Sequence, residues 1–431
     1  MFLRLFYTFC QYLVRITFWV MYERIEVRNA KNLNFVSPCI VVSNHPSTLM
    51  DPLMVAGFKM NRHVNFLANA SLFKHWFGNW FFTTFYCIKI ERPQDNNGKP
   101  LNNEAAFSKA IEHITNKGSL YIAVEGSSFM ERRLRDVKTG AARIVLLAEA
   151  ANDFQLGCNI LPVGLDYDAP HRFRSRAAIN VGEPIAVSDF KDLYLSNPNA
   201  AVIALTDAIE NGLKSVIIHV EDAEQELLLR QVEIIQQHNK QVSPIENVDR
   251  LKTSLIKIKD LKENQSAEYQ RVVSVFKTYF NDLKAEHIRD NVISKPVFAL
   301  LKIMFLILAF PIFLIGIANH LLVLIVIYLL HKKLKSLYIG YYTSMYFLTG
   351  LLILLPIIYP LQNAILASFS SICISTWLYI PLMFGCGVVA WYWYVFAKDM
   401  LGRLRISSSK YTDLKSKRLE LSAFLETFKI A

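Results

Sequence analysis

The sequence lacks paired cysteines. Its six cysteines are scattered, with no CxxC pair and none at the spacing of a zinc site. This pattern excludes a disulfide framework and indicates reduced thiols in a protein that faces the cytosol. We therefore predict no metal site. The cysteines are Cys10, Cys39, Cys87, Cys158, Cys373 and Cys386.

The first residues lack the features of a signal peptide. No small-residue cleavage site follows the apolar stretch 1–22, and Arg4 and Arg15 interrupt it. Its apolar residues recur at helical spacing, which predicts a helix over residues 1–26 that lies on a membrane surface. An amphipathic helix packed on its own domain is the alternative. The apolar positions are Phe2, Leu3, Phe6, Phe9, Cys10, Leu13, Ile16 and Val20.

Charged residues are sparse, at 19%, and positive charge dominates, with a formal net charge of +11. Hydrophobic residues make up 53% of the chain, and nearly all of the apolar excess lies between residues 297 and 397. A basic protein binds either nucleic acid or an anionic membrane surface. Because the chain also carries membrane segments, we predict a phospholipid membrane as its partner and no nucleic acid.

The C-terminal third contains three apolar stretches, at 298–330, 338–359 and 365–397. The basic segments 331–335 and 398–418 flank them, and such segments are typical of cytoplasmic loops. If the N-terminal domain is also cytoplasmic, an even number of crossings must precede Lys332. We therefore expect 298–330 to form a re-entrant hairpin or two short helices broken at Asn319 and His320. Pro381 is expected to kink or divide the last stretch.

Short β-like runs alternate with helical stretches from residue 30 to about residue 184. This alternation predicts an α/β domain with a mostly parallel sheet flanked by helices. The pattern of residues 200–295 is helical and polar, which predicts an exposed helical hairpin. The expected strands are 39–43, 64–68, 88–91, 120–124, 160–165 and 178–181, and the expected helices are 52–60, 72–80, 104–116 and 140–151.

A histidine and a carboxylate follow the first of these runs. Asn44-His45-Pro46 comes directly after the strand, and Asp51 lies a little further along the chain. A carboxylate on one ring nitrogen of a histidine fixes the tautomer and leaves the other nitrogen free to accept a proton. The pair therefore predicts a catalytic base and its orienter, with a solvated turn or a helix cap as the alternative.

Three further segments carry candidate ligands for an anion. Arg92 follows the run 88–91, where its guanidinium suits a phosphate or a carboxylate, or an ion pair with a neighbouring carboxylate. Glu125-Gly126-Ser127 ends the next run and predicts a tight turn that a ligand can approach closely. Lys138 precedes a helix N-terminus, which itself favours anions.

The order and spacing of these segments resemble the glycerolipid acyltransferase (PlsC-like, lysophospholipid acyltransferase) superfamily. That family has His-x4-Asp, then a strand ending in arginine, then Phe-Pro-Glu-Gly-Thr, then Val-Pro-Val. The counterparts here are His45 with Asp51, the segment 87–92, the segment 124–127 and the segment 161–163. Arg174 and the segment 181–185 are similar to the family's closing segment. The C-terminal region resembles the branch of yeast-type glycerol-3-phosphate acyltransferases.

This chain departs from the family pattern at several positions. Five residues rather than four separate His45 and Asp51, as in the yeast-like branch, and position 47 is Ser where that branch has Asn. Val124 replaces the proline of the family motif. Ser128 stands where many members have an arginine, so Arg92 and Lys138 become the expected anion ligands.

The resemblance implies acyl transfer from acyl-CoA or acyl carrier protein to a hydroxyl of glycerol-3-phosphate, in phospholipid biosynthesis and with no cofactor. It assigns catalysis to His45 and Asp51. Substrate binding falls to Arg92, Glu125, Gly126, Ser127 and Lys138. The alternatives are a lysophosphatidate or other lysolipid acyltransferase, and a non-catalytic lipid-binding scaffold. The expected parts are a membrane-surface helix (1–26), a cytoplasmic acyltransferase domain (27–199), a polar helical region (200–295), a multi-span membrane region (296–397) and a basic cytoplasmic tail (398–431).

Overall fold

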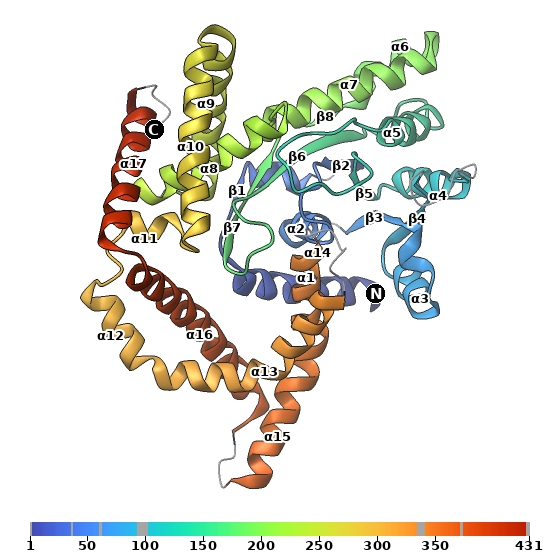
Figure 1. The fold of residues 1–431 in the computed structure, drawn as a ribbon. Helices are drawn as coiled ribbons and strands as arrows, with labels where there is room; N and C mark the ends of the chain where they lie inside the picture. The colour runs from blue at the N-terminus through green and yellow to red at the C-terminus, as the bar shows by residue number, and fades with distance from the viewer. Residues whose placement is uncertain are drawn as a thin grey trace. The chain divides into compact units, whose positions relative to one another are not determined.

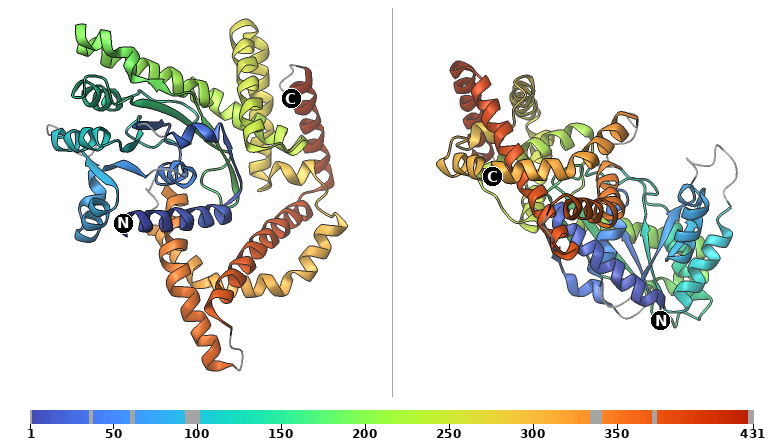
Figure 2. Two further views of the ribbon diagram at one scale, coloured as in Figure 1. Left: turned by 180° about the vertical axis from the view of Figure 1, so that it is seen from behind. Right: turned by 90° about the horizontal axis from the view of Figure 1, so that it is seen from below.

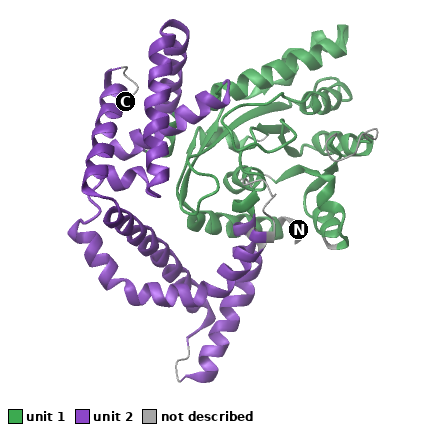
Figure 3. Cartoon of the chain, in the orientation of Figure 1, with its two compact units in different colours: residues 1–220, 243–248, 339–344 green, residues 221–242, 249–338, 345–431 purple. Residues whose placement is uncertain are grey.

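The computed structural model describes residues 2–35, 38–59, 63–92, 102–333, 341–370 and 374–427. These residues form two compact units, shown in different colours in Figure 3. The first unit contains residues 1–220, 243–248 and 339–344, and the second contains the remainder. Cys373, and Leu334 and Lys335 of the expected basic loop, lie outside the described residues.

The first unit is built on an eight-stranded sheet with the order β1-β7-β6-β2-β5-β3-β4, in which β8 also pairs with β6. All neighbouring strands are parallel except β7 and β8, which run antiparallel to β6. The strands are β1 Tyr22–Arg28, β2 Cys39–Ser43, β3 Val64–Asn69, β4 Cys87–Ile90, β5 Ser119–Ala123, β6 Asn159–Tyr167, β7 Ser175–Val181 and β8 Ile185–Ala186.

Helices cover both faces of this sheet (Figures 1 and 2). On one face, α4 (Glu104–Thr115), α5 (Gly140–Ala150) and α7 (Pro198–Val216) share a hydrophobic core with the strand residues Ile40, Val42 and Leu120. On the other, α1 (Phe2–Met21) packs against β1 and against α2 (Met50–Phe58). The shorter elements are η1 Ala30–Asn34, η2 Ala70–Phe73, α3 Trp76–Thr84, η4 Val187–Phe190 and α6 Lys191–Ser196.

The predicted α/β domain with a mostly parallel sheet is confirmed, and each expected strand is present. Two strands were not expected. The first helix ends at Met21 and β1 begins at Tyr22, inside the stretch predicted to be helical as far as residue 26. The short β8 pairs through Ile185 and Ala186 with the start of β6.

The second unit begins with polar helices that meet at a buried carboxylate. Asp290 is fully buried and lies 2.6 Å from His238 Nδ1. It also accepts hydrogen bonds from the Tyr279 hydroxyl, at 2.5 Å, and from Arg418 Nε, at 3.0 Å. These residues join α8 Ala223–Asn239, α10 Ser266–Ala285, α11 Asp290–Ser294 and α17 Ser408–Thr427; α9 spans Pro244–Asn264.

Among the residues that the structure describes, three helical stretches are long and apolar enough to cross a membrane. They are Phe310–Leu329, Tyr341–Phe369 and Thr376–Arg405. The second includes a π-helical segment around Pro356, and the third continues through Pro381 without a break. The elements are α12 Leu300–Leu308, α13 Phe310–Lys333, α14 Tyr341–Thr349, η5 Gly350–Ile358, α15 Tyr359–Phe369 and α16 Thr376–Arg405.

The expected break at Asn319 and His320 was wrong, because α13 runs through both residues and the chain instead leaves helix at Ala309. Both polar side chains have partners within the helices. His320 Nδ1 lies 2.7 Å from the Gly316 carbonyl oxygen, and His320 Nε2 lies 2.7 Å from the Tyr359 hydroxyl. An apolar helix can hold polar residues when neighbouring backbone and side chains satisfy them.

Candidate active site

His45 and Asp51 form a hydrogen-bonded pair at the edge of the sheet. His45 follows the end of β2, and its Nδ1–H donates to Asp51 Oδ2 over 2.8 Å. Asp51 lies in the first turn of α2 and is fully buried, whereas the His45 side chain is 19% exposed. Because Nδ1 is occupied by the carboxylate, Nε2 is the nitrogen that can accept a proton.

Asn44 fixes the backbone just before this pair. Its side-chain oxygen accepts the Leu165 N–H at 2.8 Å, and its side-chain nitrogen donates to the Leu165 carbonyl at 2.9 Å. Leu165 belongs to β6, the parallel neighbour of β2. The amide thus continues the ladder beyond the end of β2, and His45 leaves the sheet at a defined position.

The turn between His45 and Asp51 contains a residue in the left-handed region. Thr48 has φ of 49°, a conformation that is uncommon for a β-branched residue and needs support from its neighbours. Its N–H donates to Ser128 Oγ at 3.1 Å, and its hydroxyl lies 2.6 Å from that of Ser344. Ser128 Oγ in turn donates to the His45 carbonyl over 2.7 Å.

Glu125 is a buried carboxylate that links two loops. It follows β5, whose last residue Ala123 pairs with Ser43 of β2. One carboxylate oxygen accepts the His45 N–H at 2.9 Å and the other accepts the Arg135 N–H at 3.0 Å. Burial raises the pKa of this carboxyl group, although the two backbone N–H groups favour its ionised form.

The turn after Glu125 meets the arginine predicted from the sequence. Arg92 follows β4, and its guanidinium donates to the Gly126 carbonyl over 3.0 Å. Gly126 has φ of +70°, which explains the glycine at this position. Ser127 is half-buried next to it. Lys138 is exposed, and its Cγ would lie 4.0 Å from a Cβ built on Gly126.

The structure therefore brings together all the residues that the sequence assigned to the site. The reason is that β2, β5, β3 and β4 are parallel, so their carboxyl ends meet at one edge. Arg174 lies elsewhere. Its guanidinium donates to carbonyl groups at the end of α1, including that of Val20 at 3.3 Å, and it therefore caps that helix.

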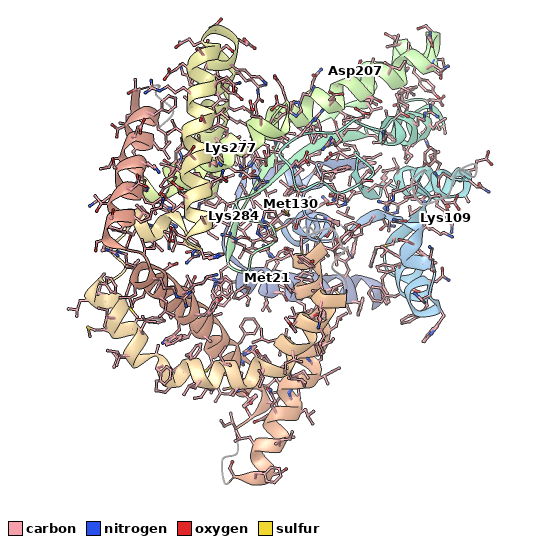
Figure 4. All side chains as sticks on the ribbon, in the orientation of Figure 1. Met21, Lys109, Met130, Asp207, Lys277 and Lys284 are labelled. Carbon is pink, nitrogen blue, oxygen red and sulfur yellow. The ribbon has the colours of Figure 1, made fainter. Side chains whose placement is uncertain are left out.

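Sequence reasoning missed Tyr167 and the role of Ser128. Tyr167 is the last residue of β6, and its hydroxyl donates to Asp51 Oδ1 over 2.8 Å. A tyrosine that ends an apolar strand gives no signal of such a contact. Arg132 was also missed; it forms a mostly buried ion pair with Asp166, at 3.0 Å. Figure 4 labels Met130 in the same segment between β5 and α5.

Comparisons with known proteins match the region that contains these residues. Residues 24–166 match the family model described as Acyltransferase. Glycerol-3-phosphate O-acyltransferase 2 of Saccharomyces cerevisiae is 33% identical over 123 residues, which cover 28% of this chain and 16% of that protein. Glycerol-3-phosphate O-acyltransferase 1 of the same yeast is 31% identical over 127 residues, which cover 29% of this chain and 17% of that protein.

The comparison with solved structures also finds similarity. One example is the structure of the 1-acyl-sn-glycerophosphate (LPA) acyltransferase PlsC from Thermotoga maritima, at 18% identity and a TM-score of 0.36. The match covers 48% of this chain and 78% of that one. The chain spans less than a fifth of the length of either yeast relative.

Proposed function

We propose, from the premise that residues 24–166 of this chain belong to the acyltransferase family, that the protein transfers an acyl group to the hydroxyl of glycerol-3-phosphate. The donor would be a thioester, acyl-CoA or acyl carrier protein. The observation that carries the proposal is the contact of His45 Nδ1 with the buried Asp51, beside the turn that Arg92 reaches. The two yeast relatives, both glycerol-3-phosphate O-acyltransferases, support the choice of acceptor.

His45 would act as the general base. As the acceptor hydroxyl oxygen attacks the thioester carbonyl carbon, its proton passes to His45 Nε2. Asp51, on the other ring nitrogen, stabilises the imidazolium that forms. The C–O bond is then made and the C–S bond broken, and the proton passes from His45 to the departing thiolate sulfur. General-base catalysis of this kind contributes about 10²–10⁴ in rate.

Arg92 and Lys138 would hold the phosphate of the acceptor, because both are cationic side chains that reach the Gly126 turn. Glu125 receives a different role. Both its oxygens accept backbone N–H groups, from His45 and Arg135, so we assign it to fixing the two loops. Gly126 and Ser127 would line the approach of the acceptor, since the turn has no side chain at Gly126.

The acyltransferase unit would meet the membrane through α1 and α3. Several large apolar side chains of these helices are exposed. The aromatic rings of Phe6 and Phe85, 4.5 Å apart, connect the two helices, since Phe85 follows α3. Rings of this kind favour the membrane–water interface. The exposed side chains are Leu5, Phe9, Tyr12, Ile16 and Trp19 on α1, and Trp76 and Trp80 on α3.

We also propose that the apolar region begins and ends on the same, cytoplasmic, side of the membrane. Asp399, near the end of α16, accepts hydrogen bonds from Arg289 at 2.6 Å and from Asn291 at 2.6 Å, just before the apolar region starts. Ends held together in this way require an even number of crossings. Of the three long apolar helices, two or none would then cross completely, unless α12 adds a crossing.

The deciding experiment offers three acceptors in parallel to the full chain in lipid nanodiscs with labelled acyl-CoA or acyl carrier protein. These are glycerol-3-phosphate, dihydroxyacetone phosphate and lysophosphatidate. We expect glycerol-3-phosphate to be acylated fastest and the His45→Ala variant to be inactive while remaining folded. Preference for lysophosphatidate would assign the second acylation instead. Absence of transfer to all three would support a non-catalytic lipid-binding protein.

A further inference from the structure

The buried carboxylate of Asp51 has a third partner besides His45 and the backbone. Tyr167 closes β6, the strand that lies next to β2 in the sheet, and its side chain is buried. Its hydroxyl donates to Asp51 Oδ1 over 2.8 Å. The two residues are 116 positions apart in the chain, so only the fold brings them together.

The two carboxylate oxygens of Asp51 accept hydrogen bonds from different donors. Oδ2 accepts the Ser47 N–H at 2.7 Å and the His45 Nδ1–H at 2.8 Å. Oδ1 faces Tyr167 and is held by its hydroxyl. A carboxylate with donors on both oxygens cannot rotate without breaking one of these contacts, so the plane of Asp51 and the orientation of the His45 ring are fixed together.

We propose that Tyr167 is a positioning residue, which acts through Asp51 to orient His45 for proton abstraction. This inference rests on the proposed acyl transfer. Tyr167 does not touch the reacting atoms itself; its hydroxyl holds Oδ1 and takes up part of the negative charge, and Oδ2 is left directed at the imidazole.

The surroundings of Tyr167 suit a permanent donor. Burial and the charge of Asp51 raise the pKa of the Tyr167 hydroxyl well above its ordinary value, so the hydroxyl keeps its proton at every working pH. The ring of Tyr22, whose centroid lies 5.9 Å away, helps to fill the space around it. A phenylalanine would fit the same space but leave Oδ1 without this donor.

Tyr22 supplies a matched control. It is also buried, it packs on Tyr167, and its hydroxyl has no hydrogen-bond partner among the residues that the structure describes. The variants Tyr167→Phe and Tyr22→Phe therefore each remove one buried hydroxyl from the same aromatic cluster. Only the first removes a hydrogen bond to Asp51.

The test compares both variants with the wild type, as full chains in nanodiscs. For Tyr167→Phe we expect kcat to fall about 10- to 100-fold, as for loss of a hydrogen bond to a charged group, with both KM values within about twofold. In the pH profile of kcat/KM, the fall on the acidic side should move to higher pH for this variant. Without the Tyr167 hydrogen bond, Asp51 carries more of its negative charge toward His45 and so stabilises the protonated imidazole. Tyr22→Phe should match the wild type in rate and in pH profile.

A second measurement does not depend on turnover. The pH dependence of carbethoxylation of His45, followed by mass spectrometry of its peptide, reports the proton on the imidazole directly. We expect its midpoint to move to higher pH in Tyr167→Phe alone. A midpoint that stays in place or moves to lower pH, or an equal change in Tyr22→Phe, would overturn the role of Tyr167. If the wild type transfers no acyl group but the midpoint moves as expected, the proposed function fails and the positioning contact stands.

Discussion

Replacing Asp51 by asparagine tests the dyad without removing a side chain from the core. The carboxylate accepts three hydrogen bonds, from His45 Nδ1, the Ser47 N–H and the Tyr167 hydroxyl. An asparagine that places its oxygen where Oδ2 lies keeps the first two. Its amide nitrogen then faces the Tyr167 oxygen, which can accept. We therefore expect Asp51→Asn to fold with the same loop geometry.

The loss in rate follows from the charge. In the proposed transition state the imidazolium of His45 would face the carboxylate, with Nδ1 and Oδ2 2.8 Å apart and Asp51 fully buried. Two unit charges with centres about 4 Å apart interact by about 4 kcal/mol at an effective dielectric constant of about 20. Since about 1.4 kcal/mol corresponds to a factor of ten, kcat should fall about 10³-fold. KM should change little, because Asp51 is fully buried behind His45 and the proposed mechanism gives it no contact with the substrate.

The assay measures release of free CoA from acyl-CoA at saturating acceptor, with the full chain in nanodiscs and thermal unfolding as the check on folding. Asp189→Asn is the control, since it removes an exposed carboxylate from the same unit. A folded Asp51→Asn variant whose kcat stays within about tenfold of wild type would show that Asp51 does not stabilise a charged His45. The dyad mechanism would then be refuted.

Further variants test the other parts of the site and the membrane region. Arg92→Ala should raise KM for the phosphate acceptor at least about tenfold with kcat nearly unchanged, as for loss of a charged hydrogen bond worth about 1.5–3 kcal/mol; an unchanged KM would make Arg92 structural. Ser128→Ala removes the Ser128 Oγ that accepts the Thr48 N–H. It should lower the free energy of unfolding by about 1–3 kcal/mol, and it should also lower kcat. The raised pKa of Glu125 means that its protonated form favours folding, a contribution that is complete below the unfolded pKa and lost as pH rises through the folded pKa. Glu125→Gln should therefore gain stability relative to wild type as pH rises from about 4, and a pH-independent difference in unfolding midpoint would contradict the shift. Cysteines introduced on both sides of the apolar region, at Lys295 and at Ser407, should react with an impermeant maleimide from the same side of a sealed vesicle; labelling from opposite sides would exclude an even number of crossings.

Four of the strands that sequence reasoning located, β2, β5, β6 and β7, are buried on both faces along nearly their whole length. The residues of β2 are all buried, and those of β5 nearly all, so each strand reads as a short continuous apolar run between turns. The strand β1 is different. It lies at the edge of the sheet, most of its residues are partly or fully exposed, and it follows α1 without a glycine or proline between them. No local signal therefore separated the strand from the helix.

The site was predictable where it depends on strand ends. His45, Glu125 and Arg92 each follow a strand, and parallel pairing alone places strand ends at one edge. Tyr167 was not predictable in this way, because β6 extends beyond the end of β2. The last residue of β2, Ser43, pairs with Val163, and β6 continues from there to Tyr167. The length by which a strand extends beyond its neighbour depends on tertiary packing. This length cannot be predicted from the hydrophobic periodicity of a single sequence.

Asn319 and His320 illustrate the opposite error, in which a local signal was read too strongly. Two polar residues inside an apolar stretch predict a break when only the sequence is considered. In the structure the Asn319 side chain donates to the Ile315 carbonyl at 2.9 Å and accepts from the Tyr379 hydroxyl at 2.8 Å. The backbone of α13 and the Tyr379 hydroxyl of α16 together thus satisfy a polar residue that looks unfavourable in the sequence of α13 alone.

Two departures from the family pattern have one structural explanation. The additional residue between His45 and Asp51 is accommodated by the left-handed Thr48, whose N–H needs an acceptor. Ser128 Oγ provides this acceptor and also donates to the His45 carbonyl. An arginine at position 128 has only donors and could not receive the Thr48 N–H. At this longer spacing the small hydroxyl residue at position 128 satisfies the Thr48 N–H, and under the proposed function the positive charge for the phosphate would come from other segments. Arg92, which already contacts the Gly126 carbonyl, would supply it together with Lys138 under that proposal.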